Sequence, residues 1–301
     1  MLVLALTAAR GGLANHRELV VHDPAAMALP ARGVRITYLG TNGYLLEARG
    51  CTLLLDPYFS RASIWRVVLG LPLESDRAVE RALARLPRHI DAIVVTHGHF
   101  DHLLDVPAIM RVRRTTLIAS HTSVLLAQAA GVERSHLRRV APGETVQVGA
   151  ATVRALTAAH DRIIGSKPPF PGTLSTVPNR PRAASDWKCG EPLAFLIEIG
   201  GRRIYVDSGG TPELLPRPTR VDLAILGVAL PDSRARLVPA LRRLRPHRVL
   251  PSHQDDFFRP LERGFTFGLL SDFPQVRRQF AAGRALGRLI LLDYFRPWTL
   301  R

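Results

Sequence analysis

Four residues able to bind a metal stand close together in the first half of the chain. His97, His99, Asp101 and His102 occur in the run THGHFDH at 96–102. His97 and His99 are two residues apart, so in an extended segment both imidazoles point to one side. Three histidines and one aspartate at fixed offsets occur by chance in on the order of one chain in a thousand. Imidazole and carboxylate suit zinc, manganese or iron, so this run predicts a metal site.

The cysteines indicate that a metal site in this chain must be built from histidines and carboxylates. Cys51 and Cys189 are the only two, and they lack Cys-x-x-Cys spacing. A disulfide framework, a zinc ribbon and thioredoxin-like redox chemistry are therefore excluded.

The elements that must position the THGHFDH run form the first of two similar halves. The run begins where a continuous Ile/Val stretch at 89–96 ends, as expected for a strand buried on both faces. Three β-rich stretches with glycine-containing turns precede it and predict an antiparallel meander at 35–40, 43–49 and 51–57. The other predicted elements of this half are helices at 74–86, 104–111 and 122–130, a strand at 115–120, and three short strands up to residue 157.

The second half repeats this order of strands followed by strand and helix units. It contains a predicted hairpin at 191–199 and 202–206, strands at 221–228, 248–252 and 288–295, and helices at 238–244 and 275–282, with Pro239 in the first turn of the former. Two such pseudo-repeated halves predict an α/β fold in which two sheets pack face to face with helices outside, a four-layer α/β/β/α sandwich. Ligands of such sheets bind at the carboxyl ends of the strands.

Four further residues at the ends of predicted strands complete a recognisable pattern. Asp56 stands in LDP at 55–57, His160 in AAHD at 158–161, Asp207 in YVDSG at 205–209 and His253 in PSH at 251–253. With the THGHFDH run, and in this order, they resemble the signature of the metallo-β-lactamase-fold hydrolase superfamily. The resemblance covers nearly the whole chain from about residue 34.

The resemblance implies a dinuclear metal centre. His97, His99 and His160 would hold one divalent ion, Asp101, His102 and His253 the second, and Asp207 would bridge them. Zinc is the expected metal, with manganese or iron as alternatives, and a hydroxide shared by two ions would be the nucleophile. Asp101 and Asp56 are the candidate catalytic carboxylates. Asp101 would accept a proton, and Asp56 would orient a histidine ligand by accepting its free N–H.

Within the superfamily the sequence looks most like the branch of ascorbate-6-phosphate lactonase-like and N-acylphosphatidylethanolamine phospholipase D-like proteins. The residues that carry this likeness are ITYLGTNG at 36–43 and LLDPY at 54–58. Members of that branch often carry histidine where this chain has Thr41, so the sequence departs from them there. Thioester hydrolases of the glyoxalase type and classical β-lactamases are alternatives, although they usually surround the third histidine with Gly and Thr.

The stretch 161–190 is the one long irregular segment, and it contains five prolines and both lysines. A loop of this length in a compact domain is commonly a lid or a binding loop. We expect it to face the substrate, with its cations on a phosphate or carboxylate group and its aromatic side chains on an acyl or aromatic part. The candidate substrate-binding residues are Arg162, Lys167, Phe170, Trp187 and Lys188.

The expected domain organisation is a lead-in segment at 1–33 followed by a single hydrolase domain at 34–301. The apolar stretch 1–9, with small residues at 12–14, could act as an export signal to the periplasm, but no basic region precedes it and Arg10 follows it. A cytoplasmic location is the favoured interpretation. No apolar run is long enough to span a bilayer.

The chain is strongly basic, with a formal net charge of +16 and a pI of about 11.3. All but two of its 41 basic residues are arginines spread over nearly every segment. The leading hypothesis is a hydrolase that cleaves a phosphodiester or lactone in an anionic small molecule or lipid, with no specific nucleic acid partner. The alternative is a basic protein that binds nucleic acid or an anionic membrane and retains the fold. The sequence leaves the oligomeric state open.

Overall fold

The structure is a computed structural model that describes residues 11–162, 167–209, 219–268, 271–282 and 287–301. The apolar stretch 1–9 that bears on export lies outside the described residues, as does Arg10. No helix within the described ranges is long and apolar enough to cross a membrane.

The first sheet carries the meander predicted from the sequence. Its order is β14-β1-β2-β3-β4-β5-β6. The strands β14, β1, β2 and β3 pair antiparallel, and β3, β4, β5 and β6 pair parallel. The bounds are β1 (Val34–Gly40), β2 (Gly43–Ala48), β3 (Cys51–Leu55), β4 (Ala92–Val94), β5 (Thr116–Ala119), β6 (Leu137–Arg139) and β14 (Pro297–Leu300).

The second sheet repeats this arrangement, with order β13-β12-β11-β10-β9-β8-β7. Here β7, β8, β9 and β10 pair antiparallel, and β10, β11, β12 and β13 pair parallel. The bounds are β7 (Thr145–Val148), β8 (Ala151–Thr157), β9 (Leu193–Ile199), β10 (Arg202–Val206), β11 (Leu223–Gly227), β12 (Arg248–Ser252) and β13 (Arg288–Leu289). The two sheets therefore confirm the two pseudo-repeated halves.

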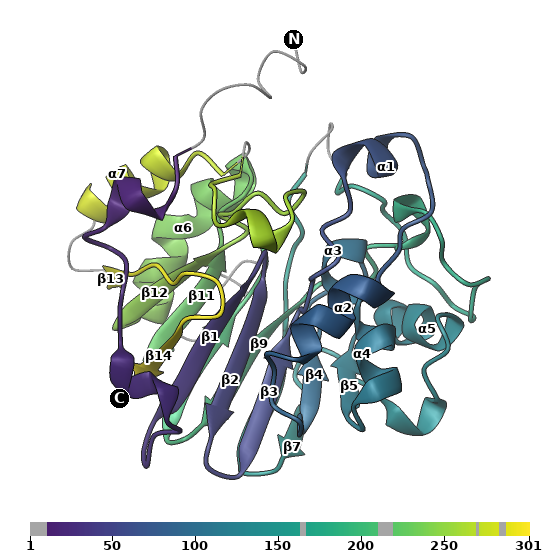
Figure 1. The fold of residues 1–301 in the computed structure, drawn as a ribbon, viewed down its shortest axis with the longest axis horizontal. Helices are drawn as coiled ribbons and strands as arrows, with labels where there is room; N and C mark the ends of the chain where they lie inside the picture. The colour runs from purple at the N-terminus through teal and green to yellow at the C-terminus, as the bar shows by residue number, and fades with distance from the viewer. Residues whose placement is uncertain (1–10, 163–166, 210–218, 269–270, 283–286) are drawn as a thin grey trace.

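Helices cover the outer faces of both sheets, which confirms the four-layer α/β/β/α sandwich (Figure 1). One buried cluster lies between the two sheets. A second cluster lies between the first sheet and its helices, and a third between the second sheet and its helices. The helices are α1 (Ile64–Val68), α2 (Asp76–Leu83), α3 (Phe100–Leu103), α4 (Val106–Val112) and α5 (His121–Ala129) on the side of the first sheet, and α6 (Pro231–Leu244) and α7 (Phe273–Ala282) on that of the second.

The helix predicted at 238–244 is longer than expected. It begins at Pro231, so Pro231 occupies the first turn and Pro239 lies in the helix interior, contrary to the prediction. A proline in a helix interior costs one backbone hydrogen bond. The helix nevertheless continues because Leu237, Leu241 and Leu244 bury an apolar stripe against the second sheet.

The strand predicted at 288–295 was wrong in its extent. Only Arg288–Leu289 pairs as β13, and the chain then crosses to the first sheet, where β14 (Pro297–Leu300) pairs with β1. Alternating apolar residues continue through Leu292 because this crossing segment still faces the core between the sheets. The helix predicted at 104–111 is observed as α4, with Pro107 in its first turn and the short α3 before it.

Candidate metal centre

The predicted metal ligands come together at the carboxyl edge of the sheets. His97 and His99 follow β4, His160 follows β8, Asp207 follows β10 and His253 follows β12. Two groups of ligand atoms result, in each of which all atoms lie within 4.8 Å of one another, namely His97, His99 and His160, and Asp101, His102 and His253. The rings of His97 and His102 are 4.0 Å apart between centroids, so the two groups are neighbours.

Hydrogen bonds to one ring nitrogen fix the orientation of three of these imidazoles. His99 Nε2 donates to the Pro169 carbonyl at 2.7 Å, and His160 Nδ1 donates to the Asp161 carbonyl at 2.7 Å. His102 Nδ1 lies 2.9 Å from Asp56 Oδ2. The opposite nitrogens of these rings are then the ones available to a metal. Accordingly, His99 Nδ1 lies 2.9 Å from His97 Nε2, and His102 Nε2 lies 3.2 Å from His253 Nε2.

Asp56 holds the loop that carries the ligands. It is fully buried, and its carboxylate accepts hydrogen bonds from the Thr96 backbone N–H at 2.7 Å, the Thr96 hydroxyl at 2.6 Å and Asn42 Nδ2 at 2.5 Å. Together with the contact to His102 Nδ1, these bonds make Asp56 a positioning residue. Its backbone has φ of +35°, a conformation that costs free energy in any residue but glycine.

Asp207 has one carboxylate oxygen that nothing in the described residues satisfies. Its Oδ1 accepts from the backbone N–H groups of Gly209 at 3.1 Å and Gly227 at 3.5 Å. Its Oδ2 is buried and has no hydrogen-bond partner within the described part of the chain. Burial raises the pKa of Asp207 to about 6. A buried, unpaired carboxylate oxygen is costly, and a bound cation would satisfy it.

The protonation of three of the histidines also fits a cation site. Burial, with help from neighbouring imidazoles, lowers the pKa of His97 far below its ordinary value, that of His99 to about 3 and that of His253 to about 4. These three rings are therefore neutral near pH 7, and neutral imidazole is the form that binds metals. At His102, burial acts in the same direction, but the carboxylates of Asp101 and Asp56 outweigh it and raise the pKa to about 10.

Asp101 remains ionised beside this cluster. Burial alone would raise its pKa, but the charge of His102 and a hydrogen bond from it hold that pKa below the ordinary carboxyl range. Asp101 Oδ2 lies 3.5 Å from His102 Nε2. Buried neutral imidazoles, an ionised carboxylate and an unpaired carboxylate oxygen form a donor set that fits divalent cations.

The described residues of the segment 161–190 lie at several points against the loop at 96–102, the candidate metal-binding loop. Besides the bond from His99 to Pro169, the Gly98 N–H donates to the Cys189 carbonyl at 3.0 Å. A Cβ at Gly98 would lie 2.3 Å from the Lys188 carbonyl oxygen, so only glycine allows this approach. The Phe170 ring packs edge-on against His99, with centroids 6.2 Å apart. Phe170 therefore lies beside a candidate ligand and also packs against the cluster between the first sheet and its helices, and its contact with substrate stays a prediction.

Two of the candidate substrate residues have other roles. Trp187 is only 2% exposed and belongs to the cluster between the first sheet and its helices, so the expectation that it faces substrate is corrected. Burying the apolar area of its indole in that core stabilises the fold more than leaving it at the surface would.

Arg162 is exposed, and its guanidinium is held by Asp232 of α6 at 2.8 and 3.0 Å, so its charge is already paired. Lys167 is exposed and Lys188 partly buried.

Several residues around the site were missed by the sequence analysis. The hydroxyls of Thr96 and Ser208 lie 3.1 and 3.3 Å from His97 Nδ1, and each directly adjoins a predicted ligand in sequence. That adjacency was the signal that could have indicated them. Arg61 and Asp255 form a buried ion pair at 2.9 Å, and nothing in their spacing, 194 residues apart, indicated it.

Comparisons with known proteins identify the family of this chain. Residues 52–254 match the family model described as a β-lactamase superfamily domain. A UPF0173 metal-dependent hydrolase of Methanosarcina barkeri is 28% identical over 231 residues, which cover 75% of this chain and 85% of the relative.

Solved structures show the same fold at low sequence identity. A possible metal-dependent hydrolase from Veillonella parvula is 14% identical with a TM-score of 0.60, covering 89% of this chain and 99% of the other. Igni18, a metallo hydrolase from Ignicoccus hospitalis, is 17% identical with a TM-score of 0.57, covering 88% of this chain and 97% of the other.

Proposed function

The chain belongs to the β-lactamase superfamily, and on that premise we propose that it is a hydrolase dependent on two divalent metal ions. The observation that carries the proposal is the pair of adjacent buried ligand groups with the unpaired Oδ2 of Asp207. A scaffold that binds no metal would gain nothing from burying such a set of polar groups. The name of the Methanosarcina barkeri relative supports the same activity.

We assign the ligands as two sets joined by one carboxylate. His97, His99 and His160 hold the first ion, and Asp101, His102 and His253 hold the second. Asp207 supplies the bridge, because its Oδ1 is tied to backbone N–H groups and its Oδ2 is free of partners among the described residues. Zinc is the expected metal, since it accepts imidazole and carboxylate ligands, with manganese or iron as alternatives.

The metal ions would supply Lewis acidity, which lowers the pKa of a water and polarises the bond under attack. The protein's own groups do the rest. Asp101, kept ionised beside His102, would accept a proton from the nucleophile. Asp56 holds the His102 ring so that Nε2 faces the cluster, and Pro169 does the same for His99 through its carbonyl. Phe170 offers an aromatic wall beside His99.

The proposed substrate is an anionic ester, either a phosphodiester or a lactone, in a small molecule or lipid. Lys167 and Lys188 lie in the segment that packs on the metal-binding loop, and both are at least partly exposed. A cation there would select a phosphate or carboxylate group. Thioesters and β-lactams are the alternative substrates, and the alternative function is binding of nucleic acid or an anionic membrane without catalysis.

Metal analysis tests the proposal. We expect about two equivalents of zinc, manganese or iron per chain in the purified protein, and a loss of metal in His97→Ala and Asp207→Ala. His89→Ala is the matched control, because His89 is exposed and pairs with Asp91 away from the cluster. A metal-free protein that binds polyanions with a steep salt dependence would instead support the binding function.

A substrate screen then tests the reaction class. The metal-loaded protein is offered bis-p-nitrophenyl phosphate, lactones, thioesters and nitrocefin, and turnover is expected with the phosphodiester or the lactones. Activity confined to thioesters or nitrocefin would contradict the proposed substrate class while leaving the metal centre intact. Turnover that is equal in His97→Ala and the parent would contradict the metal-dependent mechanism itself.

A further inference from the structure

A cavity lies at the opposite edge of the sandwich from the candidate metal centre. It has a volume of about 630 Å³, which is within the usual range for small-molecule sites. Its lining includes Arg202, Arg248 and Arg288, the first residues of β10, β12 and β13. Because these strands run parallel, their first residues lie at one edge and their last residues at the other, where the metal ligands follow.

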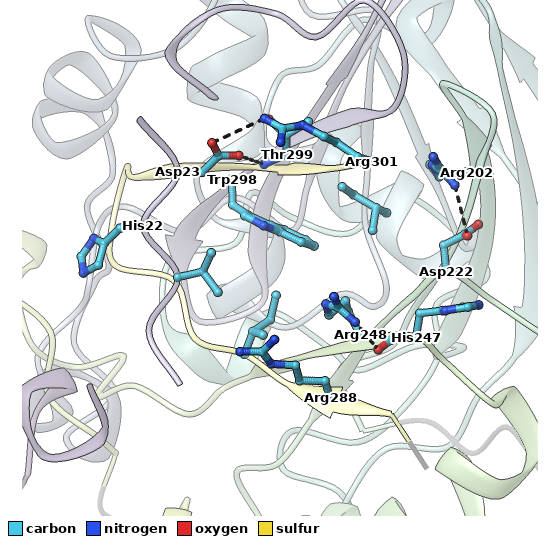
Figure 2. Close-up of a pocket in the computed structure, with 13 residues that line it drawn as sticks. His22, Asp23, Arg202, Asp222, His247, Arg248, Arg288, Trp298, Thr299 and Arg301 are labelled. Atoms are coloured by element: carbon cyan, nitrogen blue, oxygen red, sulfur yellow. Dashed lines mark hydrogen bonds and ion pairs between the residues drawn. The ribbon is translucent and has the colours of Figure 1, made fainter. Parts of the chain in front are cut away.

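Strand alternation aims these arginines into the space between the sheets. Ile204, Leu250 and Ile290 belong to the cluster between the sheets, and each stands two residues after one of the three arginines. Side chains two residues apart on a strand share a face. Trp298 of β14 approaches from the other sheet, and Figure 2 shows its indole in the middle of the cavity, between Arg301 and Arg288.

Like charges stand side by side in this cavity. Arg248 and Arg288 are partners in the register of β12 and β13, so their side chains project next to each other. Like charges directly opposite on neighbouring strands destabilise a sheet. Neither guanidinium has a carboxylate partner within the described part of the chain, and the Arg248 guanidinium donates a hydrogen bond to the His247 carbonyl at 3.1 Å. An anion between them would offset the repulsion.

The two acids in the cavity already have partners. Asp23 accepts from the Thr299 N–H at 3.1 Å and lies 3.7 Å from Arg301. Asp222 accepts from the Arg203 N–H at 2.8 Å and lies 3.6 Å from Arg202. The carboxylates therefore leave Arg248 and Arg288 uncompensated, and paired guanidinium groups are the arrangement proteins use to bind phosphate.

We propose that this cavity binds a small phosphorylated molecule that carries a planar ring, of the class of a nucleoside monophosphate. Arg248 and Arg288 hold the phosphate, and Trp298 offers its indole face to the ring, with Val21 and Ile290 as further apolar lining. Phosphate alone would leave this apolar wall in water, so the ring adds affinity. The site is separate from the metal centre and does not depend on the proposed hydrolase activity.

Binding measurements on the whole chain test this inference. Calorimetry and tryptophan fluorescence monitor the binding of AMP, adenosine and inorganic phosphate. We expect AMP to saturate one site per chain and to bind more tightly than either adenosine or phosphate. Arg248→Gln and Arg288→Gln each weaken AMP at least tenfold, and Arg288→Lys weakens it less. The control is Arg138→Gln, which removes an exposed strand arginine from the other sheet.

The melting temperatures of the same variants separate a loss of AMP binding from a loss of folding. Because Arg288→Gln removes a like-charge neighbour, its melting temperature without ligand should equal or exceed that of the parent. The inference is overturned if AMP shows no saturable binding, if Arg288→Gln binds AMP as the parent does, or if Arg138→Gln loses as much affinity. A ten-nucleotide single strand that binds where AMP does not would overturn it in favour of nucleic acid, and equal affinities for phosphate and AMP would overturn the role of Trp298.

Discussion

At the scale of single residues, the proposed metal centre depends on groups that orient its candidate ligands. His99, His102 and His160 each have one ring nitrogen engaged by an oxygen, from the Pro169 carbonyl, Asp56 and the Asp161 carbonyl respectively. The other nitrogen is thereby directed to the cluster before any ion arrives. Such preorganisation raises metal affinity because little side-chain entropy remains to be lost on binding.

Asp56→Asn should lower metal affinity by about 10- to 100-fold, since an amide nitrogen facing His102 Nδ1 would no longer fix that ring. Metal affinity is measured by competition with a chromophoric chelator, and folding by thermal unfolding. Asp91→Asn is a matched control, because Asp91 likewise accepts a strand N–H, from Thr52 at 2.7 Å, and contacts a histidine, His89. Equal loss of affinity in both variants would show that Asp56 has no particular role in the site.

At the scale of elements, strained turns at the ends of strands bring the ligands together. Thr41 after β1 and His253 after β12 both have positive φ, at +58° and +55°, and the His253 N–H donates to the Thr41 carbonyl at 2.8 Å. Asp255 ties the two turns together, because it accepts from the Thr41 N–H at 3.0 Å and pairs with Arg61 at 2.9 Å. The Tyr294 hydroxyl donates to the same carboxylate at 2.6 Å.

Removing either member of this buried pair should be costly. Arg61→Met or Asp255→Asn is expected to lower the free energy of unfolding by about 3–5 kcal/mol, because each leaves a buried group without its partner. The double variant should lose less than the sum of the two single variants. Urea unfolding of all four proteins gives this coupling, and strict additivity would contradict a direct interaction between Arg61 and Asp255.

The same pair predicts a dependence on pH. Burial alone would raise the pKa of Asp255, but the Arg61 charge and the Tyr294 hydroxyl hold it below its ordinary value. The stability that the ionised carboxylate contributes is therefore present above the ordinary carboxyl pKa and is lost as the pH falls through the lowered folded-state pKa. In Arg61→Met, protonation of Asp255 removes a buried unpaired charge. The difference in the free energy of unfolding between this variant and the parent should therefore shrink as the pH falls from 7 to 4. A constant difference would rule this out.

At the scale of the whole molecule, the charge of +16 acts in two ways. Many arginines form exposed ion pairs that contribute little to stability, for example Arg81 with Glu262 and Arg203 with Glu198. The remaining positive charges repel one another across the molecule, and this repulsion destabilises the compact folded state. At one edge of the second sheet, the fold concentrates positive charge in the cavity of Figure 2.

Modest salt should therefore stabilise this protein. Between about 20 and 200 mM NaCl we expect the melting temperature to rise, because screening weakens the net repulsion more than it weakens the exposed ion pairs. Scanning calorimetry at several salt concentrations measures the change, and a series with constant ionic strength but varied buffer controls for buffer effects. A melting temperature that falls with salt would mean that the ion pairs outweigh the repulsion.

Local sequence was sufficient for most elements, and it indicated the candidate metal ligands that the fold brings together. Alternation and turn residues predicted the meander of β1 to β3, and the Ile/Val stretch predicted β4, because these patterns reflect burial of one or both faces of a strand. The candidate ligands were visible as a short run and as residues at strand ends, and the carboxyl ends of strands are where α/β sheets bind ligands. Pro239 misled the prediction of α6, since packing against the sheet outweighs the cost of a proline inside the helix.

By itself, then, the sequence determined the sandwich and the order of its candidate ligands, because each depends on patterns within a few residues. Tertiary structure alone decided which polar groups meet. It buries Trp187 in the core and pairs the Arg162 guanidinium with the Asp232 carboxylate. It also pairs Arg61 with Asp255 and brings several arginines close to Trp298. These outcomes depend on distances between residues far apart in the chain, which no local pattern encodes.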